Sequence, residues 1–419
     1  MEQHDVADAW QNRDSDAELP PQETAAQAAG RALANWIAEH PGDSGEGGVR
    51  ILKDRTTVLV YWKGTVPAGL KSLAAAQSVP VTFEPAPYSR AELNKAMDAV
   101  TANNYGIVSA IGSEPDYSGI SIALSSKAPP NAFDQVKATA TTGIPITLRG
   151  IIDPKPLDRR TPLTGSTSAA NGCPVPARCG DSAPFYGGSL IRIQGASGTA
   201  CGTGASLYAG SYNYMSTAAH CGPGNGSGTW VGYDSGNVIG TINVAAGHLV
   251  PSKDFMIIGT ASNFGRIWFG DWKTTTSIPV RRMERPFSGA GPVTCSCSAS
   301  GSGHYQYVLR DNERWWIHDH WVQPGFYTEA YPDRNDPDNP STGWVQPGDS
   351  GSPIVTGGSS YYYLEGFMSA VGNSASPYCA PGRHPGFNGD PLYGCFTEYW
   401  ATYPDTAIGS LGGLYLKTS

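Results

Sequence analysis

Residues 348–353 are Gly-Asp-Ser-Gly-Ser-Pro, and this short stretch decides how the rest of the chain is interpreted. The glycines on both sides of Ser350 let the backbone adopt angles that other residues avoid and approach a ligand closely. In such a turn the amides of Gly348 and Ser350 can point at a developing oxyanion. The same tetrapeptide also occurs in ordinary surface turns, so a catalytic interpretation needs partner residues elsewhere in the chain.

Two earlier stretches supply the partners that a serine nucleophile needs. Residues 217–221 are Thr-Ala-Ala-His-Cys, and residues 253–258 are Lys-Asp-Phe-Met-Ile-Ile. A serine hydroxyl is a weak nucleophile until an imidazole takes its proton, and the imidazole needs a carboxylate that fixes its tautomer. We therefore predict His220 as the general base, Asp254 as the residue that orients it, and Ser350 as the nucleophile.

In this order and at these spacings the three stretches resemble the chymotrypsin-like serine endopeptidases, and more closely the secreted bacterial branch that includes the streptogrisins. The 34-residue step from His220 to Asp254 resembles that branch, whereas Asp234, the rival carboxylate, lies in a glycine-flanked turn. The resemblance covers about residues 185–405. It implies a mostly β fold of two six-stranded antiparallel barrels, an active site between them, and peptide-bond hydrolysis through an acyl-enzyme.

Composition divides the chain into two unlike regions. Of 419 residues, 15% are charged, the formal net charge is −8, and all eight cysteines follow residue 172. Residues 1–172 hold 34 charged side chains, and residues 173–419 hold 30. Such an acidic chain lacks the basic character typical of nucleic-acid binding, and no apolar run reaches the ~18 residues that span a bilayer. We therefore expect neither nucleic acid nor membrane as a partner.

The front of the chain has the pattern of a small α/β unit, and the back has that of a β protein. Helices are predicted over 24–40, 68–77 and 90–102, the last with Ser89 as its capping residue. Predicted strands lie at 56–62, 80–84, 105–111, 119–124, 144–149, 188–194, 205–209, 237–244, 254–258, 305–309, 353–356 and 361–369. The predicted divisions are a disordered segment 1–23, an α/β pro-region 24–155, a linker and processing region 156–183, and a catalytic domain 184–419 with barrels at about 184–285 and 286–410.

The front region also resembles the pro-regions of such bacterial proteases, in Trp62-Lys63-Gly64 and Pro87-Tyr88-Ser89. This resemblance implies that residues 24–155 assist folding and block the active site until they are removed. The expected partners are therefore the chain's own pro-region and protein or peptide substrates, and the enzyme is expected to be a secreted monomer. Residues 1–30 have neither the basic nor the apolar segment of a signal peptide, so a removed signal or an atypical export is expected.

The residues of the substrate pocket follow from the same resemblance and are Trp344, Ser369, Ala370, Val371 and Gly394. Trp344 stands six residues before the nucleophile, where family members that prefer basic residues carry an acid. Ser369 stands where the family supports the buried aspartate, and Val371 stands where a glycine keeps the pocket open. We therefore expect a small or medium-sized apolar residue before the scissile bond.

An even number of cysteines favours disulfides and an oxidising compartment. By resemblance, Cys201 and Cys221 form the bond that braces the catalytic histidine. The family's usual cysteine shortly before the serine is missing, and a bond between Cys379 and Cys395 is expected to compensate. The connectivity of the other four stays open, since Cys295 and Cys297 are too close for an easy mutual bond and Cys173 and Cys179 are their candidate partners.

Two further clusters have metal-binding residue types. His318 and His320 alternate as zinc ligands do on one strand face, but no further placed ligand accompanies them. Asp333, Asp336 and Asp338 crowd a loop suited to calcium, although Asx-Pro turns explain the same residues. We expect neither a metal nor another cofactor. The alternative to a protease is a catalytically silent module of the same fold that serves in binding or adhesion, but such modules usually have a broken triad.

Overall fold

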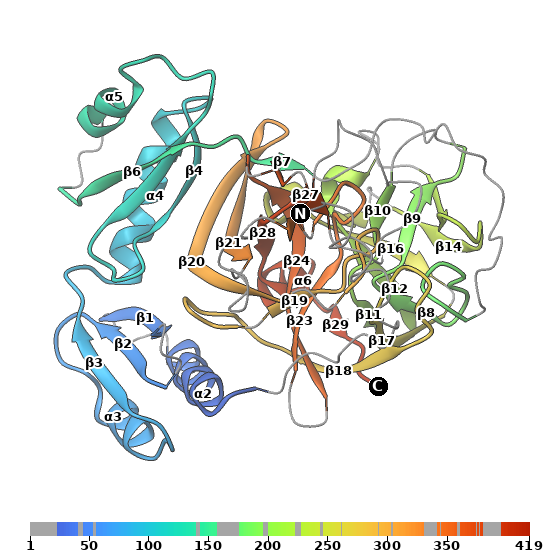
Figure 1. Ribbon diagram of the computed structural model, residues 1–419, viewed down its shortest axis with the longest axis horizontal. Helices are drawn as coiled ribbons and strands as arrows, with labels where there is room; N and C mark the ends of the chain where they lie inside the picture. Colours follow the sequence, from blue (N-terminus) through green and yellow to red (C-terminus); the bar gives the residue numbers. More distant parts are fainter. Residues whose placement is uncertain are drawn as a thin grey trace, which may run out of the picture.

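The chain is mostly β, with a smaller α/β unit at its front (Figure 1). The computed structural model describes residues 23–419 apart from 41–44, 53–55, 140–142, 157–175, 196–199, 223–227, 244–245, 261, 292, 303–304, 331–341, 344, 358–360, 374, 377 and 380–394. This architecture confirms the expected fold class. No helix in the described ranges is long and apolar enough to cross a bilayer.

Capping boxes begin the two longest helices of the front region. Thr24 precedes α2 (Ala25–Glu39) and Ser89 precedes α4 (Arg90–Asn103), and each hydroxyl accepts a hydrogen bond from the amide three residues later. Both helices and their starts agree with the sequence prediction. The other front elements are β1 (Glu46–Ile51), β2 (Val58–Trp62), α3 (Ala68–Ala75), β3 (Val81–Pro85), β4 (Val108–Ser113), β5 (Ile120–Leu124), α5 (Ala132–Thr139), β6 (Ile146–Ile151) and β7 (Lys155–Pro156).

Strands dominate the rest of the chain and form two large sheets. The first has nine strands and includes β12 and β16; the second has thirteen and includes β20, β23 and β24. In chain order the strands are β8 (Phe185–Gly187), β9 (Leu190–Ile193), β10 (Ala200–Gly202), β11 (Ser206–Ala209), β12 (Tyr212–Thr217), β13 (Thr229–Gly232), β14 (Val238–Thr241), β15 (Leu249–Val250), β16 (Phe255–Thr260), β17 (Asn263–Trp268), β18 (Ser277–Met283), β19 (Val293–Cys295), β20 (Tyr305–Ile317), β21 (His320–Ala330), β22 (Thr342–Gly343), β23 (Pro353–Gly357), β24 (Tyr362–Val371), β25 (Ala375–Ser376), β26 (Tyr378–Cys379), β27 (Cys395–Phe396), β28 (Glu398–Thr402) and β29 (Tyr415–Leu416). The described part of the back region also contains the short helices η1 (Ala219–Cys221), η3 (Pro251–Lys253) and α6 (Pro404–Gly409).

The front region shares a sheet and a hydrophobic core with the back region. Strand β4 pairs with β20, so β4, β5 and β6 extend the thirteen-stranded sheet, and Gly112 lies opposite Glu313. Leu33 of α2 belongs to the same buried cluster as Phe287. The two segments approach so closely that a Cβ atom on Gly30 would lie 2.5 Å from the Phe287 ring. The second sheet contains more strands than a six-stranded barrel because the front region adds β4 to β7 and because β8, β17 and β18, from the part of the chain expected in the first barrel, join it as well.

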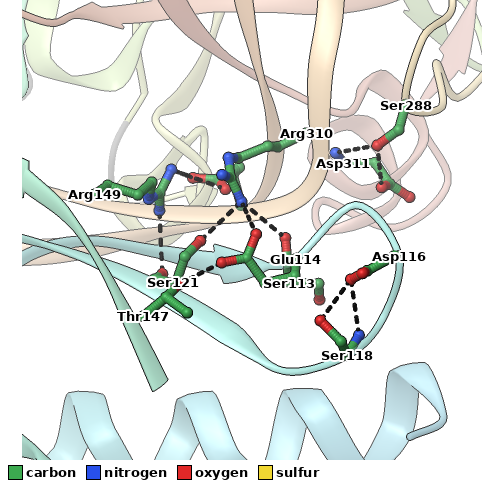
Figure 2. Close-up of polar contacts among 11 residues, drawn as sticks. Ser113, Glu114, Asp116, Ser118, Ser121, Thr147, Arg149, Ser288, Arg310 and Asp311 are labelled. Atoms are coloured by element: carbon green, nitrogen blue, oxygen red, sulfur yellow. Dashed lines mark hydrogen bonds and ion pairs between the residues drawn. The ribbon is translucent and has the colours of Figure 1, made fainter. Parts of the chain in front are cut away.

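Five consecutive residues of β20 bond to side chains of the front region, and Figure 2 shows part of this contact. The register of β20 against β21 shifts within this run, and Asn312 has φ of 62°, so the side chains do not alternate between two faces as they do in a regular strand. The pairs are Arg310 with Glu114 at 3.0 Å, Asp311 with Arg90 at 2.6 Å, Asn312 with Asn94 at 2.8 Å, Glu313 with Arg149 at 3.0 Å, and Arg314 with Asp98 at 2.6 Å.

Candidate active site

The structure brings the three predicted residues into one hydrogen-bonded line. His220 lies in η1 directly after β12, Asp254 lies between η3 and β16, and Ser350 lies in the turn before β23. His220 Nδ1 is 2.8 Å from Asp254 Oδ2, and His220 Nε2 is 2.7 Å from Ser350 Oγ. An imidazole that donates from Nδ1 to a carboxylate keeps Nε2 free to accept the serine proton. Asp254, and not Asp234, is the carboxylate in contact with His220.

Asp254 is held ionised by the groups around it. It is buried and has a left-handed backbone with φ of 45°. Burial alone would raise the pKa of its carboxyl group. The His220 ring, the Ser369 hydroxyl and the His220 amide outweigh burial, so the pKa lies below its usual value. Ser369 Oγ donates to Asp254 Oδ2 at 2.6 Å, and the amide of His220 donates to Oδ1 at 3.0 Å.

Glycines shape the turn that presents Ser350. Gly348 has φ of 104° and Gly351 has φ of 84°, both in the region that favours glycine. A Cβ atom on Gly351 would lie 2.6 Å from the backbone nitrogen of Ala218, two residues before His220. The glycine therefore lets the turn that contains Ser350 approach the segment that contains His220. Within the described residues, the amides of Gly348 and Ser350 donate no hydrogen bond, which leaves both amides available to an oxyanion.

The side chains of the three candidate residues are covered in the full chain. The side chains of His220 and Asp254 have 0% exposed surface, and Ser350 is also 0% exposed. Strand β7 of the front region pairs antiparallel with the end of β24, placing Pro156 opposite Ala370 and Lys155 opposite Val371. The covered edge of β24 thus directly follows Ser369, the residue that bonds to Asp254.

The predicted pocket residues have separate surroundings. Ser369 bonds to Asp254. Ala370 packs in a buried cluster with Trp400, and Val371 packs in the hydrophobic cluster that also contains Leu33 and Phe287. Trp344 and Gly394 lie outside the described residues, so their predicted roles stay predictions.

A histidine that the sequence suggested for metal binding lies instead against His220. His318 is at the tip of the β20–β21 hairpin, and its ring stacks on that of His220 with 5.8 Å between centroids. Lys253 Nζ, just before Asp254, donates to the carbonyl of Gln323 at 2.6 Å and ties the hairpin to the site. The expectation that His318 and His320 lie on one face of a strand is wrong, because His318 and Asp319 have positive φ and form the turn between β20 and β21. Nothing in the sequence indicated that this turn reaches His220.

Metal ligands do not gather in the part of the chain that the structure describes. No group of three or more His, Cys, Asp or Glu side chains there is placed to hold an ion. The three aspartates Asp333, Asp336 and Asp338 lie outside the described residues.

Two disulfides are described in full. Cys201 and Cys221 are bonded, as the resemblance implied, and the bond fixes the residue after His220. The expectation that Cys295 and Cys297 do not bond to each other is wrong: they form a disulfide, because the chain turns between them and brings their Cα atoms to 4.9 Å. Cys179 and Cys395 each take part in a disulfide as well. Cys173 and the side chain of Cys379 lie outside the described part of the chain.

Comparisons with known proteins give distant structural likenesses only. Protease A of Thermobifida fusca is 16% identical over 56% of this chain and 98% of its own, with a TM-score of 0.36. A chymotrypsin of Cellulomonas bogoriensis is 18% identical over 56% of this chain and 98% of its own, with a TM-score of 0.37. A glutamic acid-specific serine protease that uses a histidine triad in substrate binding is 19% identical over 55% and 100%, with a TM-score of 0.39. No family model matches the chain, and no curated protein matches its sequence.

Proposed function

We propose that the protein is a serine endopeptidase of the streptogrisin-like type that is made as an inactive proenzyme. One observation carries this proposal: His220 bridges the buried carboxylate of Asp254 and the hydroxyl of Ser350 at 2.8 and 2.7 Å. Three polar groups of these types in one line are what nucleophilic acyl transfer requires. A binding module with the same fold has no need to keep this line intact.

The geometry supports the following reaction. Ser350 Oγ attacks the carbonyl carbon of the scissile bond while His220 Nε2 takes its proton, and the resulting imidazolium is stabilised by Asp254. The amides of Gly348 and Ser350 hold the negative carbonyl oxygen. His220 then gives its proton to the leaving amine, and a water activated by the same imidazole hydrolyses the acyl-enzyme.

The proenzyme part of the proposal rests on what covers the site. The nucleophile has no exposed surface, so no substrate reaches it in this form. Strand β7 occupies the edge of β24 as an added antiparallel strand, which is how extended peptides bind an open sheet edge. The polar contacts of residues 310–314 hold the rest of the front region nearby. We infer that the front region inhibits the enzyme until the chain is cut within the predicted linker, residues 156–183.

The disulfides support a place outside the cell, because such bonds persist in oxidising compartments. The substrate preference stays as the sequence indicates, a small or medium-sized apolar residue before the scissile bond. A panel of peptides that differ in this residue tests it, and a clear preference for arginine or glutamate would contradict it.

A serine-directed fluorophosphonate probe tests the function. The full chain is expected to label slowly, and the chain nicked by limited proteolysis is expected to label fast and to cleave casein. Ser350→Ala should abolish both, while Ser72→Ala, which changes an exposed helix residue, should leave both unchanged. A nicked wild-type chain that is folded but neither labels nor cleaves would favour the silent binding module.

A further inference from the structure

One buried arginine of the back region has no part in the triad and no carboxylate bonded to it. Arg178 lies before β8, is only 2% exposed, and its amide donates to the carbonyl of Thr274 at 2.9 Å. Its guanidinium donates to four acceptors, at 2.7 to 3.0 Å: Trp268 O, Ser296 Oγ, Cys297 O and Ser302 Oγ. All four are neutral, so the positive charge is buried without a direct partner.

Such a cation is costly to bury and is retained only if the surrounding structure favours it. Burial lowers the pKa of Arg178 to about 10, and the fields of Asp271 and Asp349 oppose that shift. The side chain is therefore still charged at neutral pH. Asp349 directly precedes the nucleophile Ser350. Its electrostatic interaction with Arg178 therefore links the arginine to the reacting groups.

The link between Arg178 and Asp349 is the loop 296–302. Arg178 binds the ends of the loop, through Ser296, Cys297 and Ser302. The middle of the loop binds Asp349: the amides of residues 299 and 300 donate to its Oδ1 at 2.7 and 3.1 Å, and the Ser300 hydroxyl bonds to its Oδ2. The loop is thus held between a buried cation and a buried anion.

Asp349 in turn lies between the two amides that face a reacting carbonyl. The amide of Gln346 also donates to its carboxylate at 2.9 Å, and the side chain has 0% exposed surface. A carboxylate fixed by four donors fixes the peptide planes on both sides of its residue. Small errors in the placement of such groups reduce catalysis strongly.

We propose that Arg178 is a positioning residue: it holds loop 296–302 against Asp349 and so sets the amides of Gly348 and Ser350 for the oxyanion. This inference rests on the proposed protease function. It adds that the segment containing Arg178 belongs to the active enzyme, so that maturation cuts the chain before residue 178.

The test compares Arg178→Gln with Arg266→Gln in the full chain after the same proteolytic nicking. Arg266 is a matched control because it also donates to a hydroxyl and a carbonyl, both of Ser277, away from the loop. Each sample is normalised by fluorophosphonate titration. For Arg178→Gln, kcat is expected to fall 10²–10³-fold with KM nearly unchanged, the loss typical of a misplaced oxyanion donor. Inhibition by a peptide aldehyde, which forms a tetrahedral adduct, should weaken by a similar factor, while Arg266→Gln behaves as wild type.

A milder pair of variants covers the case in which Arg178→Gln does not fold. Ser302→Ala removes one acceptor of the guanidinium, and Arg178→Lys keeps the charge with fewer donors. Both are expected to lower kcat about tenfold or more, with KM nearly unchanged. Variants that lose thermal stability but keep kcat within threefold of wild type would overturn the inference. If wild type and Arg266→Gln are both inactive, the proposed function fails instead.

Discussion

Ser369→Ala removes a hydroxyl that joins the triad to the core. Its Oγ donates to Asp254 Oδ2 at 2.6 Å and accepts from the indole nitrogen of Trp315 at 3.1 Å. A hydrogen bond to a charged group contributes about 1.5–3 kcal/mol, and a buried donor left without an acceptor costs about 1–3 kcal/mol. Trp315 is 0% exposed, so water cannot replace the serine. The free energy of unfolding at pH 7 is therefore expected to fall by about 3–5 kcal/mol.

The pH dependence of this loss has a definite sign. The pKa of Asp254 is lowered in the folded chain, so its contribution to stability is present above the unfolded pKa of about 4 and is lost as pH falls through the folded pKa. Losing one hydrogen bond to the carboxylate raises that folded pKa, because the bond favours the charged form. The difference between wild type and variant should thus be largest near pH 7 and shrink below pH 4 to the part caused by Trp315.

Urea unfolding of the Ser350→Ala chain, in which the proposed nucleophile is replaced, measures these energies at pH 7 and pH 3. Trp315→Phe in the same background removes the indole donor, and the double variant with Ser369→Ala separates the two costs. In the active chain kcat/KM should fall only about tenfold, because the Asp254 contacts to the His220 ring and amide remain. A loss below about 1 kcal/mol at pH 7, or an equal loss at both pH values, would refute this reasoning.

Three other changes have expected outcomes. Gly351→Ala should prevent assembly of the site, since φ is 84° and the new Cβ would lie 2.6 Å from the backbone nitrogen of Ala218. Thermal unfolding measures the effect, and Gly259→Ala, whose new Cβ would have one contact at 3.6 Å, is the tolerated control. Arg149→Met leaves the 0%-exposed carboxylate of Glu313 unpaired and should cost about 3–5 kcal/mol in urea unfolding, and unchanged midpoints would contradict it. Burial raises the pKa of Asp181 to about 7. The free energy of unfolding should therefore fall as pH rises from about 4 to 7, because the native carboxyl keeps a proton that the unfolded one loses. Asp181→Asn should flatten this dependence of stability on pH, and an equally steep dependence in the variant would exclude Asp181 as its source.

The parts of the fold that were predictable depend on local signals. Ser89 lies directly before the helix that it begins, and the helix over 24–40 is rich in alanine, so short windows of sequence were enough. The contact among His220, Asp254 and Ser350 was predictable because each residue lies in its own short motif. Strand β1 was missed because its two glycines and charged residues lack the alternation typical of a strand.

Features that depend on distant contacts were not predictable. Only residues 305–309 of β20 were expected as a strand, because the polar run 310–314 has no apolar periodicity of its own. Its side chains find partners in the front region, more than 160 residues away in the chain. The approach of His318 to His220 follows from the length of that hairpin and was missed for the same reason. The Cys295–Cys297 bond depends on a tight local turn that no residue pattern indicated.

The pairing of β4 with β20 also bears on what the proposed maturation would expose. Removal of the front region would leave the stretch of β20 that pairs with β4, residues 313–315, as an open sheet edge with unpaired backbone donors and acceptors. Such edges recruit strands of other molecules and lead to aggregation unless charged side chains interrupt them. Glu313 and Arg314 lie in this stretch, and Arg310 and Asp311 shortly precede it. The charges that bind the front region would then serve as protection against edge-to-edge association, so one set of residues suits both the paired and the released state.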